Sequence, residues 1–239
     1  MKSKLLKGTL ASALLCATLL TGCQSATNQV VIYSNADDEA VTAMKNALDK
    51  NGYEGQYLFQ TFGTSELGGK LLAEGTNIEA DLVTMSSFYL ESAQDQNDMF
   101  VDLDFDTKSI EEYPNFYAPI TSQEGAIIVN TEELKTNQLT APKSMKDLAK
   151  PEYKDMISVT DISSSSTAWL LIQGIVSEYG EEGAKDILKG IYSNAGAHIE
   201  ESGSGPIKKV RTGEVAIGFG LRHQAVRDKT SGLPIDYID

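Results

Sequence analysis

Hydroxyl-bearing residues gather at points where the sequence passes from an extended pattern to a helical one. The clearest case is residues 160–176, TDISSSSTAWLLIQGIV, in which four consecutive serines and Thr167 precede an apolar helical pattern. A helix N-terminus presents backbone N–H groups that have no intrahelical partner, together with a partial positive charge. Hydroxyls add hydrogen-bond donors of adjustable direction. Such a segment can cap its own helix, or it can bind a small anion.

Four other expected strand-to-helix junctions share this composition. They lie at residues 34–36 (SNA), 63–65 (GTS), 85–87 (MSS) and 202–205 (SGSG). Any one of them is more simply a helix cap, because Ser, Thr and Asn are preferred N-cap residues. In open α/β sheets, however, ligands bind at the carboxyl ends of the strands. The five junctions together therefore predict a site for phosphate, phosphonate, sulfate or carboxylate.

The elements that must position these junctions can be predicted from alternating apolar runs and helical spacings. The order in the first part is β-α-β-α-β, which predicts an open sheet covered by helices. A second α/β unit is expected from residue 117, starting with two extended runs on either side of residues 122–123. The other expected strands lie at 30–34, 57–62, 80–85, 156–161, 197–202, 215–220 and 233–239, and the expected helices at 40–48, 66–75, 167–178, 184–195 and 205–214.

The N-terminal residues have the features of an export signal. Three lysines within the first seven residues precede an apolar run at 10–20, and LLTGC follows at 19–23. The apolar run is too short to span a bilayer stably, and the ending resembles a bacterial lipobox. We predict a signal peptide over 1–22, lipidation of Cys23, and a short polar tether over 23–29. The alternative is an ordinary signal peptide with an incidental cysteine.

Charge and cysteine content narrow the possible partners. The formal net charge is −14 over 239 residues. Such a surface repels nucleic acid and anionic membrane, so neither is expected as a partner, whereas local backbone amides can still hold a small anion. The two cysteines are Cys16, in the predicted signal peptide, and Cys23. A mature domain without a free thiol must be stabilised by its core alone.

Signatures of catalysis are missing from the sequence. The segment FGTSELGGKLL has the look of a phosphate-binding P-loop, but Lys70 is followed by Leu71 rather than Ser or Thr. There is no G-x-S-x-G elbow and no H-E-x-x-H motif, and only two histidines, His198 and His223, could serve a triad. We therefore predict no enzyme, no catalytic residue, no cofactor and no metal site.

Several stretches, in order along the chain, resemble the substrate-binding lipoproteins of ATP-driven importers. The resemblance is to the group that includes ferric-ion, thiamine, sugar-phosphate and 2-aminoethylphosphonate binders. The stretches are VVIYSNADDEAV, FGTSELGGKLLAE, ADLVTMSS, EGAIIVNT, DISSSSTAW and ESGSGPIKKVRTGEVAIGFG. The resemblance implies an α/β fold: a two-lobed clamp like the type II periplasmic binding proteins, with a ligand cleft between the lobes.

The same resemblance implies a domain organisation, a location and partners. The N-terminal lobe is expected at 30–116, and the hinge with the second lobe at 117–239. The protein is expected outside the cytoplasm as a lipid-anchored monomer that delivers its solute to an ABC permease with ATPase subunits. Because members usually continue beyond this point, we expect a truncated chain whose first lobe lacks its C-terminal return and exposes apolar surface.

The substrate can be narrowed by one departure from the ferric binders. They carry adjacent tyrosines after the G-E-x-A-x-G strand, whereas residues 218–226 here are GFGLRHQAV. Arg222 offers instead a planar donor fork for phosphate or carboxylate, unless it is a solvated surface residue. We predict a phosphonate or organophosphate ligand, with 2-aminoethylphosphonate the leading example. The expected ligand-binding residues are Ser34, Asn35, Thr64, Ser65, Ser86, Ser122, Asp161, Ser164, Ser165, Ser166, Ser202, Gly203, Ser204 and Arg222.

Some alternatives stay open at this point. An amine on the ligand would need a carboxylate or an aromatic face, and Asp161, Glu39 and Tyr33 are all possible. The alternative function on the same fold is a receptor for ferric ion or another metal. A membrane-tethered hydrolase is less favoured because no nucleophile motif is present, and a structural or adhesive lipoprotein would need no cleft.

Overall fold

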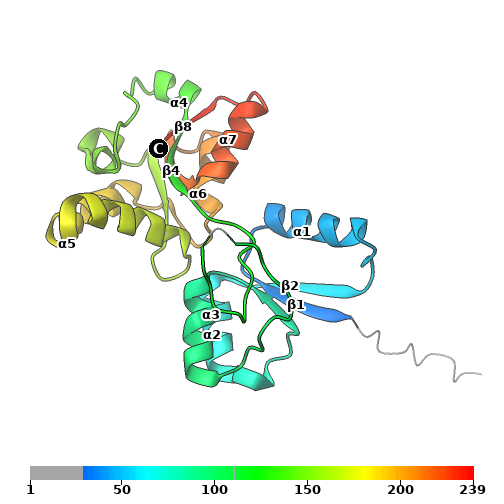
Figure 1. Ribbon diagram of the computed structural model, residues 1–239. Coiled ribbons are helices and arrows are strands. Elements are labelled where there is room, and N and C mark those ends of the chain that lie inside the picture. The colour runs from blue at the N-terminus through cyan, green and yellow to red at the C-terminus, as the bar shows by residue number, and fades with distance from the viewer. Residues whose placement is uncertain (1–28, 110) are drawn as a thin grey trace, which may run out of the picture.

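The computed structural model describes residues 29–109 and 111–239, which form two α/β lobes (Figure 1). The predicted signal peptide, Cys23 and all of the tether except Gln29 lie outside the described residues. Within the described part, no helix has both the length and the apolar character needed to cross a membrane.

The first lobe is built on a three-stranded parallel sheet of order β2-β1-β3. In the pairing register Ser34 lies opposite both Thr61 and Thr84, so the carboxyl ends of all three strands meet at one edge. Its strands are β1 (Val30–Ser34), β2 (Tyr57–Thr61) and β3 (Leu82–Thr84), and its helices are α1 (Asp38–Lys50), α2 (Thr64–Glu74) and α3 (Ser87–Asn97), with a 3₁₀ turn η1 at Gly75–Asn77.

The core of the first lobe lies between its sheet and α2 and α3. Leu71 of α2 packs with Leu90 and Ala93 of α3, and all three are buried. Other apolar side chains of this lobe are exposed, among them Leu58 on β2 and Leu82 on β3. Both belong to the outer strands of the sheet, so the sheet has apolar side chains in contact with solvent at both edges.

The second lobe contains a five-stranded mixed sheet of order β6-β5-β7-β4-β8. β5 is parallel to β6 and β7, whereas β4 is antiparallel to β7 and β8. The strands are β4 (Gly125–Asn130), β5 (Ile157–Thr160), β6 (Ile199–Glu200), β7 (Ile217–Leu221) and β8 (Ile235–Ile238). The helices are α4 (Thr131–Thr136), α5 (Thr167–Ala195), α6 (Gly205–Thr212) and α7 (Arg222–Thr230), with 3₁₀ turns η2 (Met145–Ala149) and η3 (Pro151–Tyr153).

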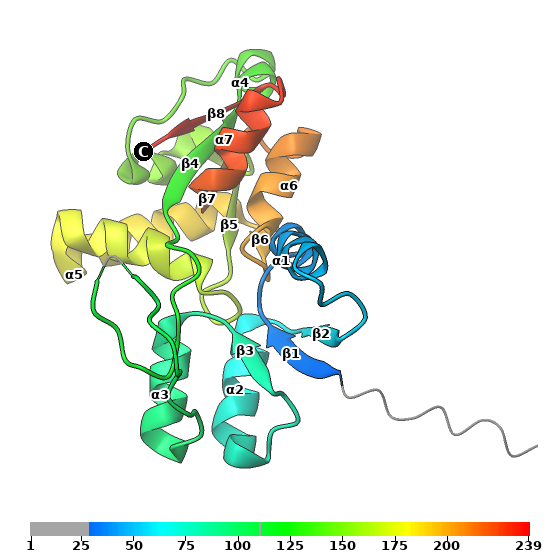
Figure 2. The same ribbon diagram turned by 45° about the vertical axis from the view of Figure 1, so that its right-hand side comes forward.

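This second sheet is buried on both faces because its side chains alternate between two apolar clusters. Ile127 and Val129 of β4 point to the cluster formed with α5, whereas Ile128 belongs to the cluster formed with α6 and α7. Figure 2 shows α5 on one side of β5, with α6 and α7 on the other. Because both faces of the sheet are packed, the carboxyl ends of its strands are held in fixed positions relative to one another.

The sequence predictions of the strands are largely confirmed, with several differences. The extended run expected before residue 122 is wrong, because the described residues 98–109 and 111–124 contain neither helix nor strand. The two helices expected at 167–178 and 184–195 are confirmed; they form the two parts of α5, on either side of a kink at Gly180, which has a φ of 69°. The helices α3, α4 and α7 were not predicted.

Candidate functional site

The three strand ends of the first lobe are joined by hydroxyl and amide side chains. Ser34 Oγ accepts a hydrogen bond from Thr84 Oγ1 at 2.7 Å and from the backbone N–H of Ala36 at 3.1 Å. Asn35 Nδ2 donates to Thr64 Oγ1 at 3.0 Å. Ser34 and Thr64 are buried. These side chains hold the junctions after β1, β2 and β3 together, which gives the edge a defined shape.

Ser65, in the first turn of α2, connects this edge to the second lobe. Its hydroxyl donates to the backbone carbonyl of Ser163. The two residues are far apart in sequence, and each follows the carboxyl end of a strand. The strand ends of the two lobes are therefore in direct contact at this point.

Asp161 organises the serine segment that follows β5. Its Oδ1 accepts from the Ser163 N–H at 2.9 Å, from Ser163 Oγ at 2.5 Å and from Ser164 Oγ at 2.9 Å. These hydrogen bonds, those from the two serine hydroxyls first, hold the pKa of Asp161 below its usual value. The DISS pattern thus forms a side-chain-to-backbone turn, which fixes the direction of the Ser163 carbonyl.

The 202–205 segment packs against the start of α5. A Cβ atom on Gly203 would lie 2.1 Å from Thr167 Oγ1 and 3.5 Å from Ser165 Oγ, so only glycine fits there. The Ser165 hydroxyl accepts from the Thr167 N–H at 3.3 Å. Ser204 is buried, and its hydroxyl lies 3.4 Å from that of Ser202. Hydroxyls from two separate segments therefore share one small volume, together with the first turns of α5 and α6.

The remaining predicted residues occupy different positions. Ser86 and Ser166 are the N-cap residues of α3 and α5, and neither side chain makes a capping hydrogen bond. Ser122 is exposed in the segment that precedes β4. Sequence reasoning missed Ser163 and Thr167 as individual contacts, although both belong to the segment it singled out.

Arg222 is paired with acidic groups of its own lobe. Its Nε donates to Asp239 Oδ1 at 2.7 Å, its Nη2 donates to Asp239 Oδ2 at 3.2 Å, and Glu124 lies 3.7 Å away. The guanidinium also lies over the ring of Tyr237, 5.0 Å from its centroid. The donor fork that made Arg222 attractive from sequence is thus occupied by a carboxylate.

Two of the three possible amine partners are also engaged. Tyr33 is almost fully buried, and the Lys70 ammonium lies 5.6 Å from its ring centroid. Glu39 pairs with Arg227 at 2.6 Å. Asp161 is half-buried, and the carboxylate contacts given above all involve its Oδ1.

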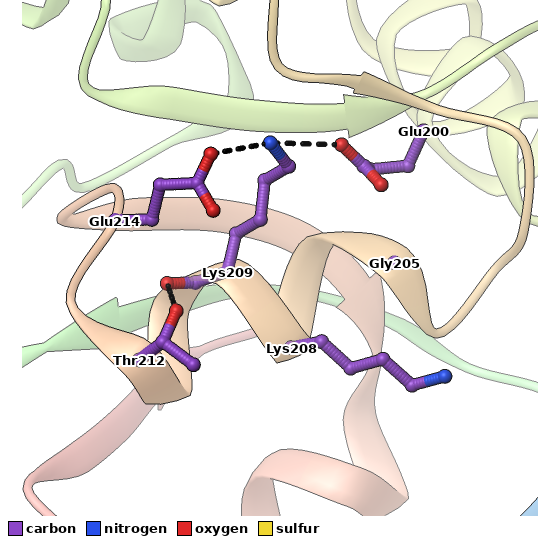
Figure 3. A pocket seen from close by; sticks show the side chains of 6 residues that line it. All are labelled: Glu200, Gly205, Lys208, Lys209, Thr212 and Glu214. Atoms are coloured by element: carbon purple, nitrogen blue, oxygen red, sulfur yellow. Dashed lines mark hydrogen bonds and ion pairs between the residues drawn. The ribbon is translucent and has the colours of Figure 1, made fainter.

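A small cavity of about 180 Å³ lies beside α6, and one of its two lysines is paired with both of its glutamates (Figure 3). Lys209 Nζ lies 2.6 Å from Glu214 and 3.3 Å from Glu200. The hydrogen bond to Glu214 is the main cause that raises the pKa of Lys209. Lys208 points away from this cluster (Figure 3). Lys209 is therefore neutralised, whereas Lys208, which also lines the cavity, is without an ion pair among the described residues.

Across residues 29–109 and 111–239, there is no group of three or more His, Cys, Asp and Glu side chains that could hold a metal ion. The polar groups at the contact between the lobes are mostly serine hydroxyls and backbone groups, which suit an anion, together with the Asp161 carboxylate, which does not.

The solved structures similar to this chain include periplasmic binding proteins. The periplasmic binding protein AfuA from Actinobacillus pleuropneumoniae, with exogenous fructose-6-phosphate bound, superposes with a TM-score of 0.74 at 23% identity, over 88% of this chain and 68% of that one. At this level of identity the likeness shows the fold. The mixed α/β fold is thus that of the type II periplasmic binding proteins, as the sequence predicted.

Two related sequences and one family complete the comparison. An uncharacterised protein of Haemophilus influenzae is 26% identical over 251 residues, covering all of this chain and 71% of the relative. The Fe(3+)-binding periplasmic protein of Serratia marcescens is 27% identical over 201 residues, and the chain spans only 57% of its length. The family described as bacterial extracellular solute-binding protein matches residues 80–232. Because this match covers more than half of the sequence, the chain belongs to the bacterial extracellular solute-binding protein family.

Proposed function

We propose that the protein binds a small phosphorus-containing anion between its lobes, with 2-aminoethylphosphonate or a related phosphonate or organophosphate as the ligand. The observation that carries this proposal is the contact between Ser65 and Ser163, which joins the hydroxyl-rich strand ends of the two lobes. A ligand at this contact would be held by both lobes at once. Binding would then favour the closed arrangement by differential contacts.

The chemistry of the surrounding groups supports an anion. The buried hydroxyls of Ser165 and Ser204 lie near helix first turns, where backbone N–H groups and the helix dipole favour negative charge. A structurally similar protein is named for bound fructose-6-phosphate, which is a phosphate ester. The proposed contacts are Asn35, Thr64, Ser65, Ser86 and Ser122 on one side and Asp161, Ser164, Ser165, Ser166, Ser202, Gly203 and Ser204 on the other, with Ser34 shaping the edge.

Arg222 is omitted from this ligand set because Asp239 already occupies its donor fork. Of the three groups considered for a ligand amine, Asp161 is the one we retain. It lies in the serine segment itself, whereas Glu39 pairs with Arg227 and Tyr33 is almost fully buried.

Ferric ion is the second candidate ligand, favoured by a specific observation. The Serratia relative, which is named as an Fe(3+)-binding protein, matches 81% of this chain. Hard ferric ion requires oxygen ligands. The ferric binders that the sequence resembles have tyrosine phenolates after the G-E-x-A-x-G strand, where this chain has Leu221, Arg222 and His223. The named relative therefore favours ferric ion, whereas the residues at 221–223 do not supply the phenolates that ferric ion would need.

The distinguishing experiment is a ligand panel read by the fluorescence of Trp169 and by thermal melting. Trp169 is the single tryptophan of the chain, is 48% exposed, and lies in the first turn of α5, directly after the serine segment. The panel contains 2-aminoethylphosphonate, glycerol phosphate, hexose phosphate, thiamine, inorganic phosphate and ferric citrate. A ligand at about a hundredfold over its Kd stabilises the fold by roughly 2.7 kcal/mol.

We expect a phosphonate or phosphate ester to raise the melting temperature and to change the Trp169 emission. If ferric citrate alone raised the melting temperature, the ligand would be assigned as ferric ion and not as a phosphonate. The Trp169→Phe variant is the control for the optical signal, because it should lose the emission change and keep the thermal shift.

The same proposal includes the location of the receptor, its membrane anchor and its partner. It would act outside the cytoplasm as a monomer anchored through lipidated Cys23, with lobes at 30–116 and 117–239, and would deliver its ligand to an ABC permease. No catalytic step is proposed, since the relatives with a stated function are named as binding proteins. Mass spectrometry of the exported protein tests the anchor, because Cys23→Ser should abolish the lipid-modified N-terminus.

A further inference from the structure

α1 of the first lobe meets α6 and α7 of the second lobe through charged side chains. Glu39 is in the first turn of α1, and it accepts a hydrogen bond from Arg227 Nη2 at 2.6 Å. Arg211 Nη1 lies 3.5 Å from the same carboxylate. Figure 2 shows α1 close to α6, away from the 98–124 segment that connects the lobes. One carboxylate of the first lobe is thus bound by two guanidinium groups of the second.

A buried carboxylate within the second lobe holds Arg211 in place and lies near Arg227. Arg211 pairs in a bidentate manner with Asp228, through Nε and through Nη2 at 3.1 Å from Oδ1. Arg227 Nη2 lies 3.8 Å from the same Asp228, which is only 4% exposed. Bidentate pairing orders the guanidinium plane before any contact with the first lobe. Less side-chain entropy is therefore lost when Glu39 arrives.

A second contact between the lobes lies beside this cluster. Gln224 Nε2 donates to Asp37 Oδ2 at 2.9 Å, while the other oxygen of Asp37 caps α1 by accepting from the Ala40 N–H. Gln224 is fully buried, and among the described residues its Oε1 has no hydrogen-bond partner. An unsatisfied buried acceptor is costly, and opening the lobes would return it to water. The free-energy cost of the unpaired Gln224 Oε1 thus favours the open arrangement, whereas the ion pairs favour the closed one. The opposition of the two keeps closure reversible.

We propose that Glu39, Arg211 and Arg227 form an interlobe latch, which stabilises the closed arrangement without touching the ligand. Two of the three latch residues, Glu39 and Arg211, are on helices that follow proposed ligand segments. α1 follows the 34–36 junction, and α6 follows the 202–205 segment. They are therefore positioning residues for ligand binding.

The latch has a quantitative consequence for affinity. When only the closed form binds tightly, the apparent Kd equals the intrinsic Kd divided by the closed fraction. Loss of the latch should lower the closed fraction of the ligand-free protein and raise the apparent Kd by about threefold to tenfold. The affinity measurement rests on the proposed function, whereas closure of the free protein can be measured without any ligand.

The test is small-angle X-ray scattering of the full chain without ligand. Glu39→Gln and Arg227→Met should each increase the radius of gyration, and the double variant should open no further than the single ones. Raising NaCl from about 0.05 to 0.5 M should open the wild type but leave Glu39→Gln unchanged, because salt screens partly exposed ion pairs. Far-UV circular dichroism checks that each variant is folded.

Asp236→Asn is the matched control. It also changes a carboxylate that lies 2.6 Å from a cation, Lys229, but this pair is within the second lobe. It should leave the radius of gyration unchanged. The latch would be overturned if both Glu39→Gln and Arg227→Met kept the radius of gyration and the salt response of the wild type. It would also be overturned if Asp236→Asn increased the radius of gyration as much as they do. Increases that add fully in the double variant would contradict it as well. A failure to bind 2-aminoethylphosphonate would count against the proposed function alone.

Discussion

Thr167 Oγ1 lies where a side chain on Gly203 would have to be placed. The separation between that oxygen and a Cβ on Gly203 would be 2.1 Å, well inside van der Waals contact. Thr167 is β-branched, buried and in the first turn of α5, so it cannot simply rotate away. The close approach of the 202–205 segment to α5 depends on this glycine, and the shape of the proposed anion site depends on that approach.

Gly203→Ala should therefore destabilise the protein by about 1–3 kcal/mol, as overpacking does elsewhere, and should weaken phosphonate binding. Urea denaturation gives the free energy of unfolding. Gly69→Ala is the control, because nothing lies within 4 Å of its added Cβ and the residue is inside α2. It should be neutral or stabilising by up to about 1 kcal/mol. Equal stability of the two variants would contradict the steric argument.

The affinity for a phosphonate should depend on the serines and not on Arg222. Ser165→Ala and Ser204→Ala each remove a hydroxyl that would bind a charged group, a loss of about 1.5–3 kcal/mol or roughly tenfold to a hundredfold in Kd. Arg222→Gln should change the Kd by less than about twofold, because the guanidinium pairs with Asp239. Isothermal titration calorimetry measures all three. A large loss of affinity in Arg222→Gln alone would return this residue to the ligand set.

Asp161 should stabilise the fold in a way that depends on pH. Its pKa is lowered in the folded state, mainly by hydrogen bonds from Ser163 and Ser164. The stabilisation is therefore complete above the unfolded pKa, about 3.8, and is lost as the pH falls through the lower folded value. Asp161→Asn should cost on the order of 1 kcal/mol at pH 7 and less at pH 3. A cost that does not change between these pH values would refute the charge-assisted role. Asp95→Asn provides a reference, because Asp95 is an exposed residue of α3.

Tyr192 should show the opposite pH dependence at the alkaline end. Burial, with a smaller effect of Asp161, raises its pKa to about 12, and its hydroxyl donates to the Thr160 carbonyl at 2.8 Å. The stabilisation is then complete below the unfolded pKa near 10 and is lost as the pH rises through about 12. Tyr192→Phe should cost about 1 kcal/mol at pH 7, and less above pH 10.

The titration of Tyr192 itself can be followed by ¹³C-tyrosine NMR. The Tyr192 resonance should titrate near pH 12 in the folded protein, and the Tyr192→Phe spectrum assigns it. Tyr53→Phe, at a site more than half exposed, should leave the stability unchanged at both pH values. Titration of Tyr192 near pH 10 in the folded state would show that the ring is not buried as described.

Local patterns were sufficient to predict the strands and the polar junctions. The β1 strand at 30–34 and the helix after the serine segment both follow from apolar spacing and from capping residues. α7 could not be predicted in this way, because RHQAVRDKT has no apolar stripe. Its buried residues include Gln224 and Asp228, which are polar, so its position depends on contacts with other segments.

The contacts between the lobes could not be predicted from the sequence either, because their residues are far apart along the chain. Glu39 and Arg227 are 188 residues apart, and nothing local to either residue identifies the other. Arg222 illustrates the same limit, since an unpaired arginine and one bound by Asp239 are identical in sequence. The residue types thus predicted which kinds of side chain could bind a ligand. Ion pairs with distant residues, which the sequence does not reveal, determine which of these side chains are free to do so.

The pairing of β4 with β8 has a consequence for the order in which the chain folds during synthesis. All strands of the first sheet lie within residues 30–84, whereas β4, at 125–130, must wait for β7 and β8 at 217–238. Distant pairings form slowly because loop closure costs entropy before the contacts compensate for it. While the ribosome makes the intervening residues, both edges of an apolar β4 lack their partners, and such edges attract other chains.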